Sequence, residues 1–293
     1  MIVGLGEILW DVLPEGKKLG GAPANFAYHA AQLGLNSIAV SAIGNDALGD
    51  EIEQYLQQYR LQALLPRVDF PTGTVEVQLS GQGIPTYQIH EGVAWDNIPV
   101  SSDLIRIAKQ TRVVCFGSLA QRNSVSRQTI RRFIEEMPTG AHCYKVFDIN
   151  LRQHYYDAET INTSLELCNV LKINDEELAI VGDMFGLGGI SDADKCWALL
   201  GRYGLRMLIL TCGTKGSYVY SPGKVSFQPT PLVEVADTVG AGDSFSAAFV
   251  SAIVQGWTIE EAHQRAVNIS AYVCTQHGAM PRLPEELIQR RYL

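Results

Sequence analysis

The sequence has few of the features that mark secreted, metal-rich or nucleic-acid-binding proteins. Its six cysteines lie far apart and form no C-x-x-C pair, so we predict reduced core residues rather than disulfides or zinc ligands. Basic residues are also scarce, because 23 lysines and arginines stand against 31 acidic residues and leave a net charge of −8. This balance argues against nucleic acid or an anionic membrane as a partner.

Long apolar runs and zinc-binding histidine patterns are missing as well. The opening residues, MIVGLGEIL, have neither a basic flank nor an extended apolar core. We therefore expect no signal peptide and no membrane span there, and a cytoplasmic protein. The motif H-E-x-x-H begins at His90 and Glu91, but Ala94 stands in place of its second histidine.

Two common nucleotide-binding motifs are incomplete. Gly4 and Gly6 begin the dinucleotide pattern G-x-G-x-x-G, but Leu9 occupies its third glycine position. The stretch 211–216, TCGTKG, does not fit the P-loop pattern G-x-x-x-x-G-K-[ST]. The first stretch therefore does not indicate a Rossmann dehydrogenase, and the second is not a P-loop.

The chain does contain a glycine-rich junction at 237–243, DTVGAGD. Apolar residues at helical spacing follow it, so we predict a helix from about Ala241 to just before Gly256. The glycines then lie at the helix N-terminus, where unpaired N–H groups and the helix dipole favour a bound phosphate. Asp243 would repel that phosphate unless it takes a proton from an attacking hydroxyl. An ordinary glycine-rich turn with a first-turn acid is the alternative.

Most of the remaining chain alternates short apolar strands with helical patterns. This rhythm predicts an α/β fold with a mostly parallel sheet covered by helices. It breaks at 72–98, where period-two patterning and a Gly-Gln-Gly-Ile-Pro turn predict a hairpin. With the strand around Asp11, this insertion would form a small separate sheet, and an edge hairpin of the main sheet is the alternative.

Two stretches resemble signatures of one enzyme family. DTVGAGD with its small-residue helix is similar to the C-terminal signature of the ribokinase-like carbohydrate kinases of the phosphofructokinase B type. GGAPAN, at 20–25, resembles the N-terminal signature in the form found in fructokinases. The resemblance covers nearly the whole chain and implies a ribokinase-like three-layer sandwich. It also implies a single kinase domain over 1–293, with a β lid formed by about 9–20 and 72–98.

The family's catalytic roles carry over to the matching positions. The resemblance makes Asp243 the catalytic base, and Gly240, Ala241 and Gly242 the anion hole for the transferring phosphoryl group. Arg152 stands in a D-x-N-x-R stretch at the end of a predicted strand, and the resemblance places it near the phosphates. A surface arginine that caps a carbonyl is the alternative.

The resemblance also implies a sugar site. Asp11, Gly20, Gly21 and Asn25 would bind the sugar, since carboxylate and amide groups pair with hydroxyls that leave water. Trp95, where the insertion returns to the core, would meet the substrate. Each has an alternative. Asp11 could be a solvent-facing strand position, the glycine pair a tight turn, and Trp95 an ordinary packing residue.

Further positions are implied for the nucleotide and metals. Asn174 and Glu177 form an N-x-x-E pattern in which Glu177 would hold Mg²⁺ through water, although a helix capping box explains the same two residues. Asp237 would bind a monovalent cation such as K⁺. The cofactor-binding positions that the resemblance implies are Asn174, Thr211, Gly213, Lys215, Gly216, Asn268 and Gly278.

The resemblance thus implies an ATP-dependent, Mg²⁺-requiring sugar kinase. Its partners would be the sugar, ATP and, through the lid, a second copy of the chain. D-fructose is the favoured acceptor, because GEILWD, GGAPAN and DINLR resemble fructokinases more than ribokinases or adenosine kinases. A ribokinase, a ketodeoxygluconate kinase, a nucleoside kinase and a non-catalytic sugar sensor are the alternatives.

Overall fold

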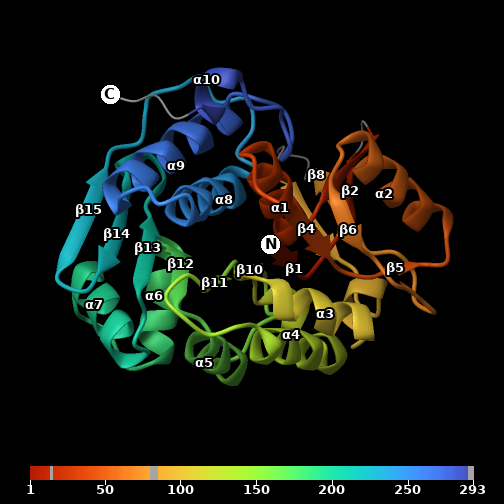
Figure 1. Cartoon of the computed structure of the whole chain (residues 1–293), viewed down its shortest axis with the longest axis horizontal. Helices are drawn as coiled ribbons and strands as arrows, with labels where there is room; N and C mark the ends of the chain where they lie inside the picture. Colours follow the sequence, from red (N-terminus) through yellow and green to blue (C-terminus); the bar gives the residue numbers. More distant parts are fainter. Residues whose placement is uncertain (14–15, 80–84, 290–293) are drawn as a thin grey trace.

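A nine-stranded sheet runs through the centre of the protein (Figure 1). The computed structural model describes residues 1–13, 16–79 and 85–289. Neighbouring strands pair in parallel from β13 to β6, whereas β14 and β15 extend the sheet in antiparallel fashion. This confirms the predicted mostly parallel sheet. In spatial order the strands are β15 (Lys224–Gln228), β14 (Ser217–Ser221), β13 (Met207–Thr211), β12 (Val170–Asn174), β11 (Tyr144–Asp148), β10 (Val113–Phe116), β1 (Ile2–Leu5), β4 (Ser37–Val40) and β6 (Gln62–Leu64).

Helices cover both faces of this sheet, as Figure 1 shows. Separate apolar clusters fill the two sides, so the fold has three layers and the central strands are buried on both faces. One face carries α1 (Ala22–Gln32), α8 (Ala241–Val254), α9 (Ile259–Cys274) and the short α10 (Glu285–Ile288). The other face carries α3 (Ser102–Gln110), α4 (Ser124–Glu136), α5 (Ala158–Leu167), α6 (Asp175–Met184) and α7 (Asp192–Arg202).

A small four-stranded sheet stands beside the main one. Its order is β3 (Gly16–Gly20), β2 (Leu9–Leu13), β8 (Thr74–Leu79) and β9 (Pro85–Ile89). The β2–β3 and β8–β9 pairs are antiparallel and the β2–β8 pair is parallel. The predicted pairing of the 72–98 insertion with the strand around Asp11 is confirmed, while the predicted turn falls partly at 80–84, outside the described residues.

The chain between the two halves of the small sheet returns to the core. This part of the chain contains the strand β5 (Ile43–Gly44), the helix α2 (Ala47–Gln58), and the strands β6 and β7 (Arg67–Val68), in that order. Strands β5 and β7 pair in parallel, and α2 packs against β5 and β6. The 3₁₀ turn η1 (Ala94–Asn97) then leads from β9 back to α3. The small sheet is therefore anchored to the core at both of its ends.

Helix α1 packs directly on strand β1 because glycines allow a close approach. A Cβ at Gly4 would lie 1.9 Å from the carbonyl oxygen of Pro23, so no larger residue fits at this point of the strand. Gly21, the N-cap of α1, has φ 115°, and a Cβ there would lie 2.4 Å from the carbonyl oxygen of Glu7. Together the two glycines bring the start of α1, with Asn25, to the carboxyl end of β1.

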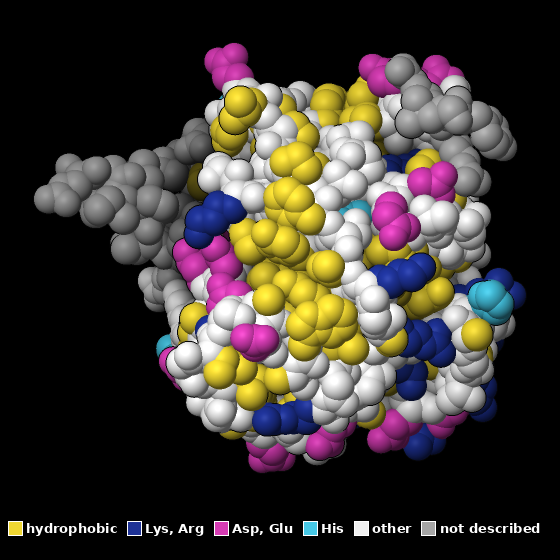
Figure 2. Space-filling model, turned by 90° about the vertical axis from the view of Figure 1, so that its left-hand side faces the viewer, with side chains coloured by type: hydrophobic (Ala, Val, Ile, Leu, Met, Phe, Trp, Pro, Cys, Tyr) yellow, Lys and Arg dark blue, Asp and Glu magenta, His cyan; other side chains and the backbone are white. Residues whose placement is uncertain are grey.

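Exposed apolar side chains gather on the side of the molecule that carries β15 (Figure 2). Val225 and Phe227, on β15, are 53% and 48% exposed, and Leu232 is fully exposed. The six cysteines are unbonded, and four of them are buried, as the predicted reduced core residues would be. Among the described helices, none has the length and apolar character needed to cross a bilayer.

Candidate active site

Two neighbouring helices begin without a side-chain cap. The N-cap residues are Gly21 of α1 and Gly240 of α8, which have φ values of 115° and 79° and no capping side chain. Every other described α-helix except the four-residue α10 has an N-cap side chain that accepts a bond from its first turn. The two starts lie close together, because Asn25 of α1 contacts Asp243 of α8. In the first turn of α1, the N–H of Ala22 bonds to Glu7 and Pro23 has no N–H. The first turn of α8 is therefore the better candidate for binding an external anion.

Asp243 lies in the first turn of α8 and contacts α1. Its Oδ2 accepts a hydrogen bond of 2.8 Å from Asn25 Nδ2, which joins two predicted residues 218 positions apart. Burial and then the Asp148 carboxylate raise the pKa of Asp243 to about 7, against the lowering effects of Asn25, Lys172 and Arg152. A carboxylate with a pKa near neutrality is suited to taking a proton from a hydroxyl.

The predicted anion hole is enclosed on two sides. A Cβ at Gly240 would lie 2.7 Å from the backbone of Ala279, and one at Gly242 would lie 2.9 Å from Lys172 Nζ. The backbone of Ala279 and the positive φ exclude a side chain at Gly240, whereas at Gly242 a Cβ would displace the lysine ammonium. Helix α8 begins at Ala241, where the spacing predicted it.

The predicted sugar residues lie around the carboxyl end of β1. A Cβ at Gly20 would lie 2.4 Å from Asp11 Oδ2, so this glycine makes room for the carboxylate. Burial raises the pKa of Asp11 to about 6, against the charges of Arg152 and Lys18. Asn25 is 3% exposed, and its Oδ1 has no partner among the described residues. A buried acceptor of this kind suits a donor hydroxyl.

A second buried carboxylate, Glu7, was missed by the sequence analysis. It is 6% exposed, its Oε2 has no partner among the described residues, and burial raises its pKa. Arg152 interacts electrostatically with Glu7, Asp11 and Asp243, so it faces the same space from the loop after β11. In this structure Arg152 is exposed and its Nη1 donates to the carbonyl of Leu151, which is the alternative predicted for it.

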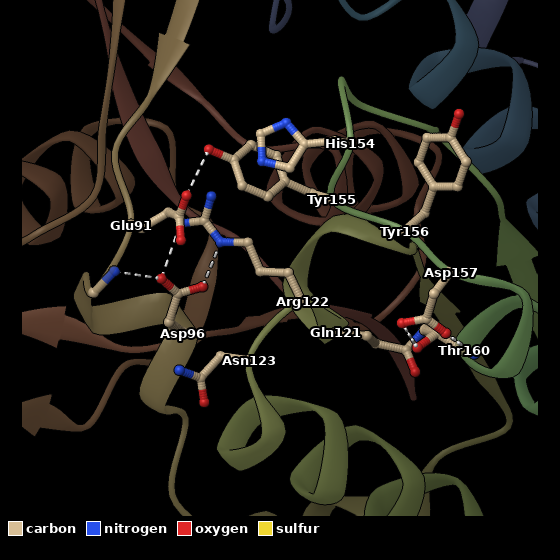
Figure 3. Close-up of a pocket in the computed structure, with 11 residues that line it drawn as sticks. Glu91, Asp96, Gln121, Arg122, Asn123, His154, Tyr155, Tyr156, Asp157 and Thr160 are labelled. Atoms are coloured by element: carbon tan, nitrogen blue, oxygen red, sulfur yellow. Dashed lines mark hydrogen bonds and ion pairs between the residues drawn. The ribbon is translucent and has the colours of Figure 1, made fainter.

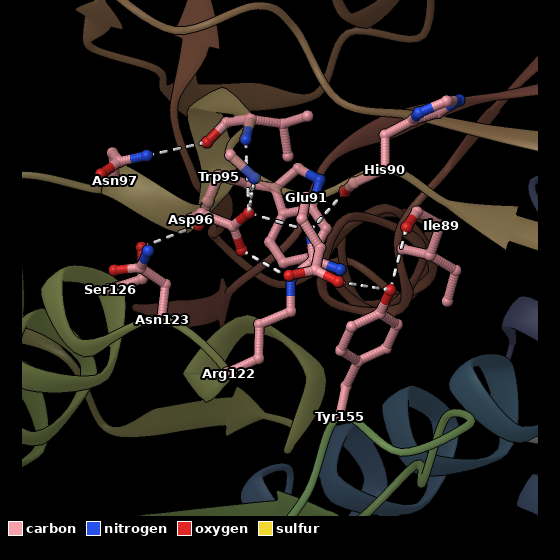
Figure 4. A network of polar contacts seen from close by, with 12 residues as sticks. Ile89, His90, Glu91, Trp95, Asp96, Asn97, Arg122, Asn123, Ser126 and Tyr155 are labelled. Atoms are coloured by element: carbon pink, nitrogen blue, oxygen red, sulfur yellow. Dashed lines mark hydrogen bonds and ion pairs between the residues drawn. The ribbon is translucent and has the colours of Figure 1, made fainter.

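Trp95 packs in the core, which is the alternative predicted for it. It is 1% exposed, and the guanidinium carbon of Arg122 lies 4.0 Å from the centre of its ring. Arg122 also bonds to both oxygens of Asp96 at 2.8 Å and to the carbonyl of His90 (Figure 4). The arginine and aspartate are both buried, so this ion pair fixes the segment that follows β9.

Tyr155 closes the other side of Arg122. The guanidinium carbon lies 4.7 Å from the centre of the tyrosine ring. The hydroxyl of Tyr155 lies 3.1 Å from the carbonyl oxygen of Ile89, at the end of β9, and 3.1 Å from Glu91 Oε1 (Figure 4). Since Tyr155 follows Arg152 by three residues, this network ties the arginine's loop to the root of the small sheet.

A cavity of about 360 Å³ opens beside this network (Figure 3). Its lining includes Arg122, the N-cap residues Asn123 and Asp157, and the rings of His154 and Tyr156. None of the predicted site residues lines it. We therefore place the candidate active site at the ends of α1 and α8 rather than in this cavity.

Glu177 occupies the N-terminus of α6, beside the candidate site. Its Oε2 accepts from Asn174 N at 3.0 Å while Asn174 Oδ1 accepts from Glu177 N at 2.8 Å, so the capping box is confirmed. Its Oε1 accepts from Leu151 N at 2.9 Å. Each oxygen keeps a lone pair for a metal-bound water, so the carboxylate fits an indirect hold on Mg²⁺. The described residues contain no group of acidic, His or Cys side chains that would bind a metal directly.

The predicted phosphate turn follows β13. Gly213 and Gly216 have φ values of 54° and 113°, and Thr211 is the last residue of the strand. The side chain of Lys215 is 79% exposed, 3.5 Å from Asp175 at the start of α6. The turn thus presents an exposed positive charge next to the capping box.

Asp237 links the turn that precedes α8 to the turn that follows α9. Its Oδ1 accepts from Val239 N at 3.0 Å and its Oδ2 from Gly278 N at 3.1 Å. Both predicted positions, Asp237 and Gly278, therefore meet in the structure. Asn268, on α9, is exposed and accepts from Gln264 at 3.0 Å.

Comparisons with known proteins identify similar chains over nearly the whole length. The chain is 30% identical to an ATP-dependent 6-phosphofructokinase of Thermoanaerobacterium thermosaccharolyticum, covering 97% of this chain and 91% of that protein. It is 30% identical to a fructokinase of Salmonella typhimurium, covering 96% and 95%. Among solved structures, a fructokinase double mutant from Vibrio cholerae with fructose, ADP and potassium bound is 25% identical, with a TM-score of 0.81 over 98% of this chain and 96% of that one.

A family model also matches residues 15–286, and its description is pfkB family carbohydrate kinase. The match spans both signatures and the strands and helices between them. It agrees with the three-layer fold, the small sheet and the glycine-rich start of α8. The chain belongs to the pfkB family of carbohydrate kinases and is a carbohydrate kinase with the ribokinase-like fold.

Proposed function

We propose that the protein transfers the γ-phosphoryl group of ATP to a terminal hydroxyl of D-fructose. The observation that carries the proposal is the contact of Asn25 with Asp243, between the uncapped starts of α1 and α8, in a chain of this family. A base and an anion site lie side by side there. The choice of fructose rests on the fructokinase-like form of the motifs and on the relative and the solved structure that bear that name.

In the proposed reaction, Asp243 takes the proton of the attacking hydroxyl. Its pKa of about 7 suits it to hold that proton briefly and release it afterwards. Asn25 donates to Asp243 and so orients the carboxylate, while its own Oδ1 accepts from a sugar hydroxyl. The N–H of Gly242 and the side chain of Arg152 stabilise the charge that spreads over the transferring group. The N–H of Ala241 would join them by leaving the carbonyl of Thr238, to which it donates at 3.3 Å in this structure.

ATP and its metal ions fit the neighbouring turns. Mg²⁺, when bound, neutralises phosphate charge, and Glu177 with Asn174 would hold its waters. Lys215, whose side chain is 79% exposed, would leave Asp175 to reach the phosphates. Thr230 bonds to Gly213 of the same turn, and the exposed Leu232 follows two residues later. The Asp237 carboxylate, which joins the turns at 239 and 278, is the proposed support of a K⁺ site.

The small sheet is the proposed lid of the site. It carries Asp11 on β2 and ends at the segment fixed by Arg122, so its closure would bring the sugar-binding carboxylate over the acceptor. Closure would also exclude water, which otherwise competes as a phosphoryl acceptor. Within the chain, the lid comprises about 9–20 and 72–98.

A panel of acceptors tests this proposal. We expect the kcat/KM with Mg·ATP to be highest for D-fructose among fructose, ribose, glucose, ketodeoxygluconate, adenosine and fructose 6-phosphate. Asp243→Asn serves as the background control. A higher kcat/KM for another acceptor would overturn the fructose assignment and leave the kinase mechanism standing. No transfer to any of them, with sugar binding retained, would favour the sensor instead.

A further inference from the structure

A lysine lies beneath the candidate anion hole. Lys172, on β12, is 7% exposed, and its Nζ lies 2.9 Å from the position that a Cβ at Gly242 would occupy. Burial of an ammonium group is costly, because it loses its hydration shell. A side chain at position 242 would displace this ammonium from the first turn of α8. Its place therefore requires an explanation beyond the packing of the strand.

Lys172 belongs to a buried polar cluster that joins three elements. Its Nζ lies 3.0 Å from Asp148 Oδ1, at the end of β11. The other oxygen of Asp148 accepts a bond of 2.9 Å from the hydroxyl of Ser246, on α8. The strands β11 and β12 are thereby fixed to the helix that starts with the anion hole.

The ammonium faces an excess of negative charge. Besides Asp148, which lies 3.0 Å away, the carboxylates of Glu177 and Asp243 interact electrostatically with Lys172. A phosphoryl group that enters here approaches all three of these carboxylates. Without the charge of Lys172, that repulsion would be offset only by the backbone dipoles, Arg152, Lys215 and bound Mg²⁺.

We propose that Lys172 is a fixed cation of the anion hole, which stabilises the transferring phosphoryl group from beneath Gly242. The inference rests on the proposed kinase function and adds to it a residue that no motif contains. A buried ion pair is weak support for stability, because apolar residues of similar volume often serve equally well. The glycine above the ammonium and the three carboxylates around it point instead to a role in charge stabilisation.

Removing Lys172 alone does not test the proposal, because it leaves Asp148 buried and unpaired and lowers stability. The informative comparison is between the single variant Asp148→Asn and the double variant Asp148→Asn, Lys172→Met. Both lack the carboxylate at position 148, and they differ only in the cation at position 172. They are compared where circular dichroism shows both folded. If the methionine variant does not fold, Lys172→Gln in the same background keeps a side-chain hydrogen bond to the asparagine and replaces it.

We expect kcat to be at least about tenfold lower without the ammonium, with the KM for sugar and ATP changed by about twofold or less. The affinity for MgADP with aluminium fluoride, a stand-in for the transferring group, should fall by a similar factor when sugar is present. The affinity for MgADP alone should stay within about twofold. A merely structural role of Lys172 would not produce this difference between the two ligands. Equal kcat and equal fluoride-complex affinity in the two variants would overturn the proposal. Absence of phosphoryl transfer in the unaltered protein would instead refute the proposed function.

Discussion

Replacing Asp243 by Asn should stabilise the protein at alkaline pH while it removes activity. The pKa of Asp243 is about 7 in the folded protein, against 3.8 for an ordinary aspartate. Because the folded pKa is the higher one, the native protein keeps a proton that the unfolded chain loses between pH about 4 and about 7. Stability therefore falls as the pH rises through this window, and the full cost of ionisation is present above pH about 7.

The size of this cost follows from the shift. A difference of roughly three pKa units corresponds to about 4 kcal/mol, and relaxation of the site makes this an upper bound. Asn at position 243 still accepts the hydrogen bond from Asn25 Nδ2 and carries no charge. We expect the variant to be about 1–4 kcal/mol more stable at pH 8, which for a domain of this size raises Tm by about 2–4 °C per kcal/mol.

Thermal unfolding of both proteins at pH 5 and pH 8, without ligands, measures this effect. The gain should be larger at pH 8, while turnover falls by about 10²–10⁴-fold because the general base is lost. The matched control is Asp103→Asn in the first turn of α3, where the carboxylate is 60% exposed. This control should lose about 0.3–1 kcal/mol of helix-terminus stabilisation and none of the activity. A destabilised Asp243→Asn variant at pH 8, or one that keeps its turnover, would refute the reasoning.

Three further predictions concern the surroundings of Asp243. Glu177→Gln should raise the Mg²⁺ concentration needed for half-maximal rate, because an amide attracts metal-bound water less strongly; a loss that excess Mg²⁺ does not restore would leave only the capping role. Tyr155→Phe keeps the ring beside Arg122 but loses the contacts to Ile89 and Glu91, so we expect a higher KM for sugar at nearly unchanged Tm, and kinetics with unchanged KM would contradict this. Hydrogen exchange of 74–76 and 88–89 should slow when sugar saturates the protein, since lid strands have low local stability; identical exchange with and without sugar would argue for a static sheet.

The parts of the structure that the sequence predicted are those encoded over short spacings. The start of α8 at Ala241 and the capping box of Asn174 and Glu177 follow from residue types a few positions apart. The small sheet followed from period-two patterning, which is equally local. The contact of Asn25 with Asp243 has no such signal, and the resemblance to a family was needed to expect both residues in one site.

The residues that the sequence analysis missed act through contacts between distant segments. Lys172 stands in the apolar strand VLKIN, and its role depends on Asp148 and Gly242, which come from other elements. Arg122 and Glu7 are similar cases, since each is buried by segments far away in sequence. One signal was present, because a charged residue inside a strand of a parallel sheet is seldom buried without a partner. That signal identifies the residue but not the partner.

In the proposed site, the reacting groups and the groups that would surround the rest of the acceptor come from different elements. Asp243, Gly242 and Lys172 belong to α8 and the central strands. In the proposed reaction they would face the hydroxyl and the phosphoryl group that every sugar kinase shares. Asp11 belongs to the small sheet and Glu7 to the turn before it, where the remaining hydroxyls of a sugar would lie. A site that pairs buried polar groups rejects ligands that leave them unpaired. Acceptor choice should therefore change through substitutions around Asp11 and Glu7, while substitutions around Asp243 should change the rate for all acceptors alike.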